Sequence, residues 1–263
     1  MEDRAEDIAV HIDADGVATV TIDRAAKRNA LRLAMWRRLG SVFTALGSRA
    51  DVRSILLTGN GGHFCAGADV SEFSTVRNTI EAGRNYEAAA EAATLAIRDC
   101  AKPTIAAISG FGLGGGCGIA LACDIRAGDT TTRMGIPAAR LGNVYGTLDC
   151  DLLLRQVGLA SAKLVLFTGR HFDVDECQRM GLVDVVGEAS ALDAARVLAS
   201  NLGANAPISI KGAKIVLEAL QRGETGRRQR EISAVIDEAL SSADYRDAAR
   251  SFVEKRKPVF TGR

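Results

Sequence analysis

The chain has 263 residues, of which 47% are hydrophobic and 25% charged, a balance close to that of average globular proteins. This length fits one main domain with an appendage better than two full domains. The formal net charge is only +1, so no overall field favours nucleic acid or an anionic membrane as a partner.

Six cysteines are spread along the chain without a C-x-x-C pair, and only three histidines are present. We therefore expect no metal site, and thiols that are reduced and packed. Residues 1–7 are acidic and hold no apolar segment, which excludes a secretory signal and argues against a transit peptide. No apolar run reaches the ~20 residues that a membrane-spanning helix needs. The sequence thus favours a cytoplasmic protein.

The first part of the chain predicts strands that alternate with helices. Alternating apolar residues predict two short strands within 8–22, joined by a tight turn. Apolar residues at helical spacing predict a helix over 33–47. A continuous apolar run over 52–58 predicts a buried strand that ends in a glycine-rich turn, and the alanine-rich stretch 81–99 predicts a helix.

The middle of the chain repeats the strand pattern before helices take over. Residues 103–109 predict a strand that enters a glycine cluster at 110–116, with a helix directly after it and a further strand over 124–127. From 149 onward the pattern is mainly helical, and helices are expected over most of 208–255. An α/β core followed by a helical extension is the predicted fold class. We expect the core to cover residues 1–200 and the helical region residues 201–263.

Two glycine-bearing loops are candidate sites, namely residues 63–69, after a predicted strand, and residues 114–117, between a strand and a helix. Small residues let the backbone approach a ligand closely, and a helix N-terminus adds unpaired N–H groups. Two such groups that converge on one oxygen would form an oxyanion hole. Taken alone, each loop is more often a purely structural turn than a site.

A nucleotide-binding alternative rests on Gly110-x-Gly112-x-x-Gly115, which satisfies the dinucleotide fingerprint between a strand and a helix. That motif calls for an acidic residue near the end of the next strand. Asp124 and Asp129 come too early in the chain for this role and fit poorly.

Taken together, several short segments resemble the crotonase superfamily, the enoyl-CoA hydratase/isomerase family, over nearly the whole chain. The segments that carry the resemblance by their order and spacing are residues 28–31, 64–69, 103–110, 114–117, 122–124, 167–170, 180–183 and 254–258. The resemblance implies a spiral of ββα units and a C-terminal helical region that assembles a homotrimer, often as a dimer of trimers. It also implies an acyl-CoA substrate, with coenzyme A as part of that substrate and no permanently bound cofactor.

The resemblance assigns roles to particular residues. The backbone N–H groups of Ala68 and Gly115 would form the oxyanion hole for the thioester oxygen. Lys27, Arg28 and Ala66 would lie along the coenzyme A. At the other end of the chain, Lys255 and Lys257 would approach the CoA phosphates, in some family members from a neighbouring subunit. These lysines and Arg28 also fit an ordinary solvated face.

This sequence departs from the family at both hydratase glutamates. Gly118 and Ala138 stand at these positions, and neither side chain can transfer a proton. General acid–base help is typically worth roughly 10²–10⁴-fold, so ordinary hydration is disfavoured. The usual double-bond isomerisation relies on the second glutamate and is disfavoured as well. Tyr145 stands in a segment that is similar to that of methylmalonyl-CoA decarboxylase-type relatives, where a tyrosine lines the acyl pocket. We therefore expect decarboxylation or another enolate reaction, with Tyr145 contacting the substrate or simply packed.

Two further interpretations stay open. A conventional hydratase/isomerase could use a relocated base, for which Glu72 and Asp149 are the candidates. Alternatively, the chain could be a catalytically degenerate CoA-binding subunit. His63, Asp69 and Arg140 are weaker polar candidates near the predicted loops; Asp69 is expected to hold its own loop in shape.

Overall fold

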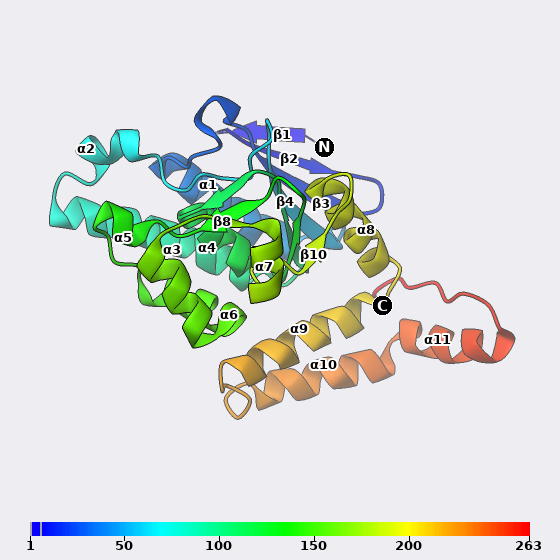
Figure 1. Ribbon diagram of the computed structural model, residues 1–263. Helices are drawn as coiled ribbons and strands as arrows, with labels where there is room; N and C mark the ends of the chain where they lie inside the picture. The colour runs from blue at the N-terminus through cyan, green and yellow to red at the C-terminus, as the bar shows by residue number, and fades with distance from the viewer. Residues whose placement is uncertain (1, 6) are drawn as a thin grey trace.

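The computed structural model describes residues 2–5 and 7–263 (Figure 1). Residues 1 and 6, which belong to the acidic segment discussed above, lie outside the described residues. The larger of two sheets has seven strands. In spatial order these are β1 (Glu2–Ala5), β2 (Ile8–Ile12), β3 (Val17–Ile22), β4 (Ser54–Gly59), β5 (Thr104–Ile108), β7 (Ile125–Gly128) and β10 (Val185–Val186).

The strands of this sheet change from antiparallel to parallel at β3. β1, β2 and β3 pair antiparallel, whereas β3, β4, β5, β7 and β10 pair parallel. β3 alternates between buried and half-buried residues, and β5 is buried at every position. Strands that are buried on both faces require helices on both sides of the sheet. Helices follow these strands in the chain, as the predicted alternation of strands and helices requires.

Helices cover the two faces of the parallel strands. α1 (Leu33–Ser48) and α3 (Ile80–Arg98) pack against each other and contribute to the main hydrophobic core. On the opposite face, α8 (Ala191–Gly203) places three alanines against Leu56 and Ile105 in a second core cluster. Small alanine side chains let this helix approach the sheet closely.

A small second sheet stands beside the first. Its strands are β6 (Phe111–Leu113), β8 (Arg133–Gly135) and β9 (Phe172–Asp173). α4 (Gly115–Ala122) follows β6 directly and is buried from its second residue to its last. The dinucleotide fingerprint does not form a phosphate loop here, because Gly112 lies inside β6 and packs against Ile108 and Met134.

The remaining elements complete the path of the chain. They are the 3-10 turns η1 (Ala25–Lys27) and η2 (Val70–Glu72) and the helices α2 (Phe73–Val76), α5 (Ala138–Leu141), α6 (Thr147–Thr168), α7 (Val174–Met180), α9 (Pro207–Gln221), α10 (Gln229–Ser241) and α11 (Ala243–Glu254). α6 contains a break at Gly158, whose φ is 74°. No helix among the described residues is long and apolar enough to cross a membrane.

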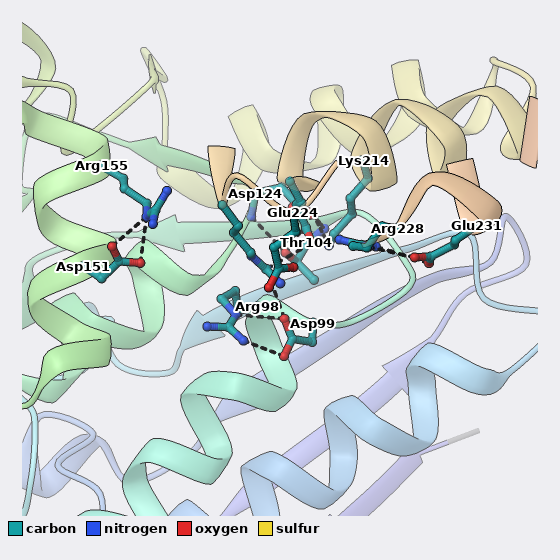
Figure 2. A network of polar contacts seen from close by, with 12 residues as sticks. Arg98, Asp99, Thr104, Asp124, Asp151, Arg155, Lys214, Glu224, Arg228 and Glu231 are labelled. Carbon is teal, nitrogen blue, oxygen red and sulfur yellow. Dashed lines mark hydrogen bonds and ion pairs between the residues drawn. The ribbon is translucent and has the colours of Figure 1, made fainter. Parts of the chain in front are cut away.

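α9, the first helix of the C-terminal region, is attached to the core by ion pairs (Figure 2). Lys214 on α9 donates to Asp124 at 2.8 Å, and the same carboxylate accepts from the backbone and hydroxyl of Thr104 at 2.7 and 3.0 Å. Arg222 reaches Asp99, at the end of α3, at 3.1 Å. The boundary predicted at residue 200 falls inside α8, which packs on the sheet. The division into a core and a C-terminal region stays a prediction.

Candidate active site

A cavity of about 470 Å³ opens between the loop after β4, α3, the start of α4 and the segment that joins α5 to α6. Apolar and small residues make up most of its wall. Five titratable side chains line it as well, namely Arg77, Tyr86, Glu87, Tyr145 and Asp149. Ala68, Gly115 and Ala138 also lie on the wall. The structure thus brings together the two predicted oxyanion residues, the predicted tyrosine and one of the two vacant glutamate positions.

The two predicted oxyanion amides are neighbours in this wall. An ideal Cβ on Gly115 would lie 4.0 Å from the Ala68 nitrogen, and one on Gly67 would lie 3.2 Å from the Gly115 nitrogen. Gly115 is the first residue of α4, so its N–H has no partner within the helix. Within the part of the chain that the structure describes, neither the Ala68 nor the Gly115 N–H donates a hydrogen bond. Both are therefore available to one ligand oxygen.

Backbone pairing holds the first of these loops against β6. Cys65 and Gly112 form a parallel bridge, in which the Cys65 N–H donates to Phe111 at 2.7 Å. Gly67, at the bend of the loop, has a φ of 96°, and a Cβ there would lie 2.7 Å from the Leu113 oxygen. Only glycine fits this left-handed conformation and this close approach without strain.

A buried hydrogen-bond chain fixes the same loop from the other side. The Trp36 indole N–H donates to the Tyr86 hydroxyl at 2.9 Å, and that hydroxyl donates to the Leu31 carbonyl at 3.2 Å. The Leu31 N–H donates to Gly67 at 2.7 Å, and its carbonyl accepts from the Asp69 N–H at 2.9 Å. Ala68 lies between these two contacts, so its amide is held in place by residues of α1 and α3.

Asp149 is a cavity residue that the sequence presented only as one of two candidates for a relocated base. It lies in the first turn of α6 and lines the cavity. A Cβ built on Gly118, one turn into α4, would lie 2.9 Å from the Asp149 Oδ1 atom. Burial raises the pKa of this carboxyl to about 6, and the nearby charges of Glu87 and Glu91 act in the same direction. The carboxylate therefore stands beside one of the two positions where the family glutamates are missing.

Tyr145 lines the same cavity. Its hydroxyl would be 3.4 Å from a Cβ on Gly114, which places it at the start of α4. Burial, together with the charge of Asp149, raises the pKa of Tyr145 above its ordinary value. The phenol thus keeps its proton at neutral pH and can donate a hydrogen bond into the cavity.

The other acidic candidates have structural partners. Glu72 accepts a hydrogen bond from the Leu33 N–H at 2.6 Å, at the start of α1. Asp69 accepts from Ser71 and from Arg24, the latter at 2.6 Å. Burial of Asp69 opposes its ionisation, but these hydrogen bonds outweigh it and hold its pKa at about 2. Both carboxylates shape the loops around the cavity.

His63 and Arg140 do not line the cavity. The Nδ1 atom of His63 accepts from the Phe111 N–H at 3.2 Å, and the imidazole stacks on the Phe111 ring with centroids 4.7 Å apart. Burial, aided by the charge of Arg28, lowers the pKa of His63. Arg140 is exposed and packs beside Gly169.

The predicted CoA-binding residues fall into two separate groups. Arg28 and Ala66 are adjacent, because the Ala66 N–H donates to the Arg28 carbonyl at 3.0 Å, and Lys27 ends η1 just before them. Lys255 and Lys257 instead follow α11, on the side of the molecule away from α2 and α5 (Figure 1). The structure therefore does not bring these two lysines to the cavity of their own chain. A contribution to a neighbouring subunit stays a prediction.

The comparison with known proteins agrees with this fold and site. The model of the enoyl-CoA hydratase/isomerase family matches residues 13–263. The chain belongs to this family, whose members act on CoA thioesters, and the resemblance to the crotonase superfamily is confirmed. It is similar to the short-chain-enoyl-CoA hydratase of Clostridium acetobutylicum, with 36% identity over 92% of both chains. It is also similar to the 2,3-dehydroadipyl-CoA hydratase of Escherichia coli, with 31% identity over 94% of this chain and 96% of the relative.

Solved structures confirm the predicted crotonase-like α/β fold. An enoyl-CoA hydratase/isomerase family protein from Hyphomonas neptunium superposes with a TM-score of 0.92 at 34% identity, over 98% of both chains. An enoyl-CoA hydratase from Bacillus anthracis superposes with a TM-score of 0.89 at 27% identity, over 98% of this chain and all of the other. The protein is accordingly an acyl-CoA enzyme of this family.

Proposed function

We propose that this protein catalyses the hydration or isomerisation of an enoyl-CoA. The amides of Ala68 and Gly115 would stabilise the thioester enolate that forms as the intermediate. The single observation that carries the proposal is the pair of neighbouring N–H groups without acceptors in the cavity wall. Removal of one oxyanion donor typically costs about 3–4 kcal/mol of transition-state stabilisation. The pair is thus sufficient to account for a large part of the catalysis.

The charge of the cavity favours proton transfer over loss of carbon dioxide. Asp149 and Glu87 both line it, and Arg77, the basic residue of the wall, is already paired with Glu87. A substrate carboxylate would meet negative charge where decarboxylation requires it to bind. This argument departs from the expectation of decarboxylase-like chemistry that the missing glutamates raised.

Decarboxylation remains the second candidate because of Tyr145. Its protonated hydroxyl lies in the cavity near Gly114, where it could hold a carboxylate or return a proton to the enolate. That reaction needs no base, since the electrons of the breaking C–C bond form the enolate directly. The two candidate reactions share the oxyanion hole. Hydration or isomerisation needs a proton-transfer group beside it, whereas decarboxylation needs a place for the substrate carboxylate.

The test is turnover of two thioesters in separate incubations. We would treat crotonyl-CoA in D2O and methylmalonyl-CoA in water with purified protein and analyse the products by mass spectrometry. Addition of water to crotonyl-CoA, or deuterium exchange into it, supports the proposal. Loss of carbon dioxide from methylmalonyl-CoA without either change would favour the second candidate. Binding of both compounds without turnover of either would contradict the proposal and indicate a degenerate CoA-binding subunit.

A further inference from the structure

The carboxylate of Asp149 on α6, which lines the cavity, lies against Gly118 on α4. A real Cβ atom essentially never lies under 3.0 Å from another heavy atom, yet a Cβ on Gly118 would lie 2.9 Å from the Asp149 Oδ1 atom. The next nearest atom, the carboxyl carbon of Asp149, would be at 3.8 Å. A side chain at position 118 would therefore require this carboxylate, the end of a flexible side chain, to shift from its present position. α4 lacks the family glutamate at position 118, and the Asp149 carboxylate of α6 lies beside that position.

We propose that Asp149 is the proton-transfer group of this enzyme and that its carboxylate replaces the glutamate that hydratases of this family carry at position 118. The proposal rests on the proposed function, because it supplies the acid–base group for the same enolate. It does not require any residue at position 138, where Ala138 is buried at the start of α5.

The Asp149 carboxylate is chemically available. Within the described part of the chain it makes no hydrogen bond or ion pair, although it lines the cavity with Gly115 and Tyr145. Glu87, the other carboxylate of the wall, is paired with Arg77. A buried or half-buried carboxylate usually has partners, so an unpaired one in a cavity is typical of a functional group.

The groups around Asp149 set its protonation. Glu87 and Glu91 face it from α3, Tyr145 from the segment before α6, and Cys117 from α4. Cys150 follows it in the chain, and the charge of Asp149 contributes to its raised pKa. Burial and the two glutamates bring the pKa of Asp149 to about 6. At neutral pH the group is therefore mostly ionised, with a proton affinity well suited to a general base.

The chemistry balances with one carboxylate. In hydration, Asp149 takes a proton from water as the water oxygen bonds to C3 of the enoyl group. The C2=C3 π electrons move onto the thioester oxygen, which the Ala68 and Gly115 amides hold as an enolate. Collapse of the enolate takes the same proton back from Asp149 to C2, so the carboxylate is regenerated. In isomerisation, Asp149 would move a proton from C4 to C2 through the same enolate.

The first test compares two matched variants on a thioester that the wild-type protein converts. Asp149→Asn should lower kcat by roughly 10²–10⁴-fold while the Kd for butyryl-CoA, a saturated analogue, stays unchanged. Asp151→Asn is the control, because Asp151 lies on the same helix but pairs with Arg155 outside the cavity. This control should keep wild-type turnover. A wild-type rate in Asp149→Asn would overturn the role of Asp149 and leave the proposed function intact.

The second test moves the carboxylate between the helices. The double variant Gly118→Glu with Asp149→Ala should regain at least tenfold over Asp149→Ala alone, because the vacated space admits the longer side chain. The wild-type kcat should fall about tenfold per pH unit below the pKa of Asp149, and this decline should be lost in Asp149→Asn. Absence of rescue together with an unchanged pH profile would contradict the proposal. If the wild-type protein itself converts no enoyl-CoA, the proposed function fails first and this inference fails with it.

Discussion

The ionisation of Asp149 opposes folding, because the carboxyl is harder to ionise in the folded chain than in the unfolded one. Its pKa is raised by burial and by two glutamates from the ordinary 3.8 to about 6. A raised pKa of an acid adds stability below the unfolded value, and this stability is lost as the pH rises through the folded value. At neutral pH the wild-type protein therefore carries a charge that the fold disfavours.

We predict that Asp149→Asn is more stable than the wild type by on the order of 2–3 kcal/mol at about pH 7.5, with the difference vanishing at about pH 4. Urea unfolding at both pH values measures this. Asp151→Asn, whose partner Arg155 lies at the surface, should show no such gain. A destabilised Asp149→Asn at neutral pH would mean that the carboxylate is well solvated or paired. A more stable but less active variant is the usual sign of a functional group.

The position of α4 depends on glycine. A Cβ on Gly116 would collide with the carbonyl oxygen of Cys65 and lie 2.9 Å from the carbonyl carbon. These are backbone atoms, which cannot move aside without displacing the loop that carries Ala68. The second glycine of α4 therefore sets the distance between the two oxyanion amides.

Gly116→Ala should destabilise the protein by about 1–3 kcal/mol and lower kcat by at least tenfold, because overpacking shifts α4 away from the loop. Gly83→Ala is a suitable comparison, since Gly83 lies within α3 with open space around it. That change should raise stability by about 0.5–1 kcal/mol and leave turnover intact. Thermal unfolding together with the thioester assay distinguishes the two. Equal behaviour of both variants would be inconsistent with the tight contact at Gly116.

The attachment of α9 to the core depends on a largely buried ion pair. The Lys214 side chain is 12% exposed and reaches both Asp124 and the Lys102 carbonyl. Lys211 on the same helix pairs with Glu238, but both of those side chains are close to half exposed. We predict that Lys214→Ala costs about 2–3 kcal/mol in urea unfolding, whereas Lys211→Ala costs at most about 1 kcal/mol. Similar losses for both would show that burial does not decide the contribution of these pairs.

Segments whose signal is local were predictable from the sequence. The helix over α1, the buried strands β4 and β5 and the loop with Ala68 all follow from short-range periodicity or glycine spacing. β6, β8 and β9 were not predicted, because strands of two or three residues are too short to show alternation. β1 was missed because its polar residues carry no strand signal.

The sequence pointed to the candidate oxyanion hole but not to the candidate proton-transfer group. The glycine loops that carry Ala68 and Gly115 are visible in the sequence, and the resemblance to the family assigns these two amides their predicted role. The role of Asp149 depends on how α6 packs across α4, which no pattern around position 149 reveals. Gly118 signalled the loss of a side chain, and only the tertiary structure shows what fills the space. The sequence offered Glu72 as a candidate base alongside Asp149. In the structure, Glu72 accepts a hydrogen bond from the backbone at the start of α1.

For the whole molecule, assembly decides whether Lys255 and Lys257 can meet coenzyme A. Phe252 and Val253, just before them on α11, are 87% and 80% exposed in the single chain. Apolar side chains exposed together commonly mark an interface. The expected trimer, or dimer of trimers, would cover them and would carry the lysines toward a neighbouring chain.

We predict a trimer or hexamer of 27.7 kDa chains by light scattering. The double variant Lys255→Ala and Lys257→Ala should raise KM for the acyl-CoA about tenfold with little change in kcat, because phosphate contacts act on binding. Arg196→Ala, an exposed basic residue on α8, serves as the control. A monomer with an unchanged KM in the double variant would remove these lysines from the site.

The close contact between position 118 and the Asp149 carboxylate has a consequence for how such a site can evolve. A chain with a glutamate at position 118 that first gains the aspartate must shift one of two neighbouring carboxylates, whose like charges disfavour ionisation of both. A chain that first loses the glutamate at position 118 passes through a state that keeps only the second family glutamate, at position 138. Both routes pass through an enzyme with lower activity. We therefore expect relatives to carry either a glutamate at position 118 or an aspartate at position 149. Active relatives with both carboxylates or with neither should be rare.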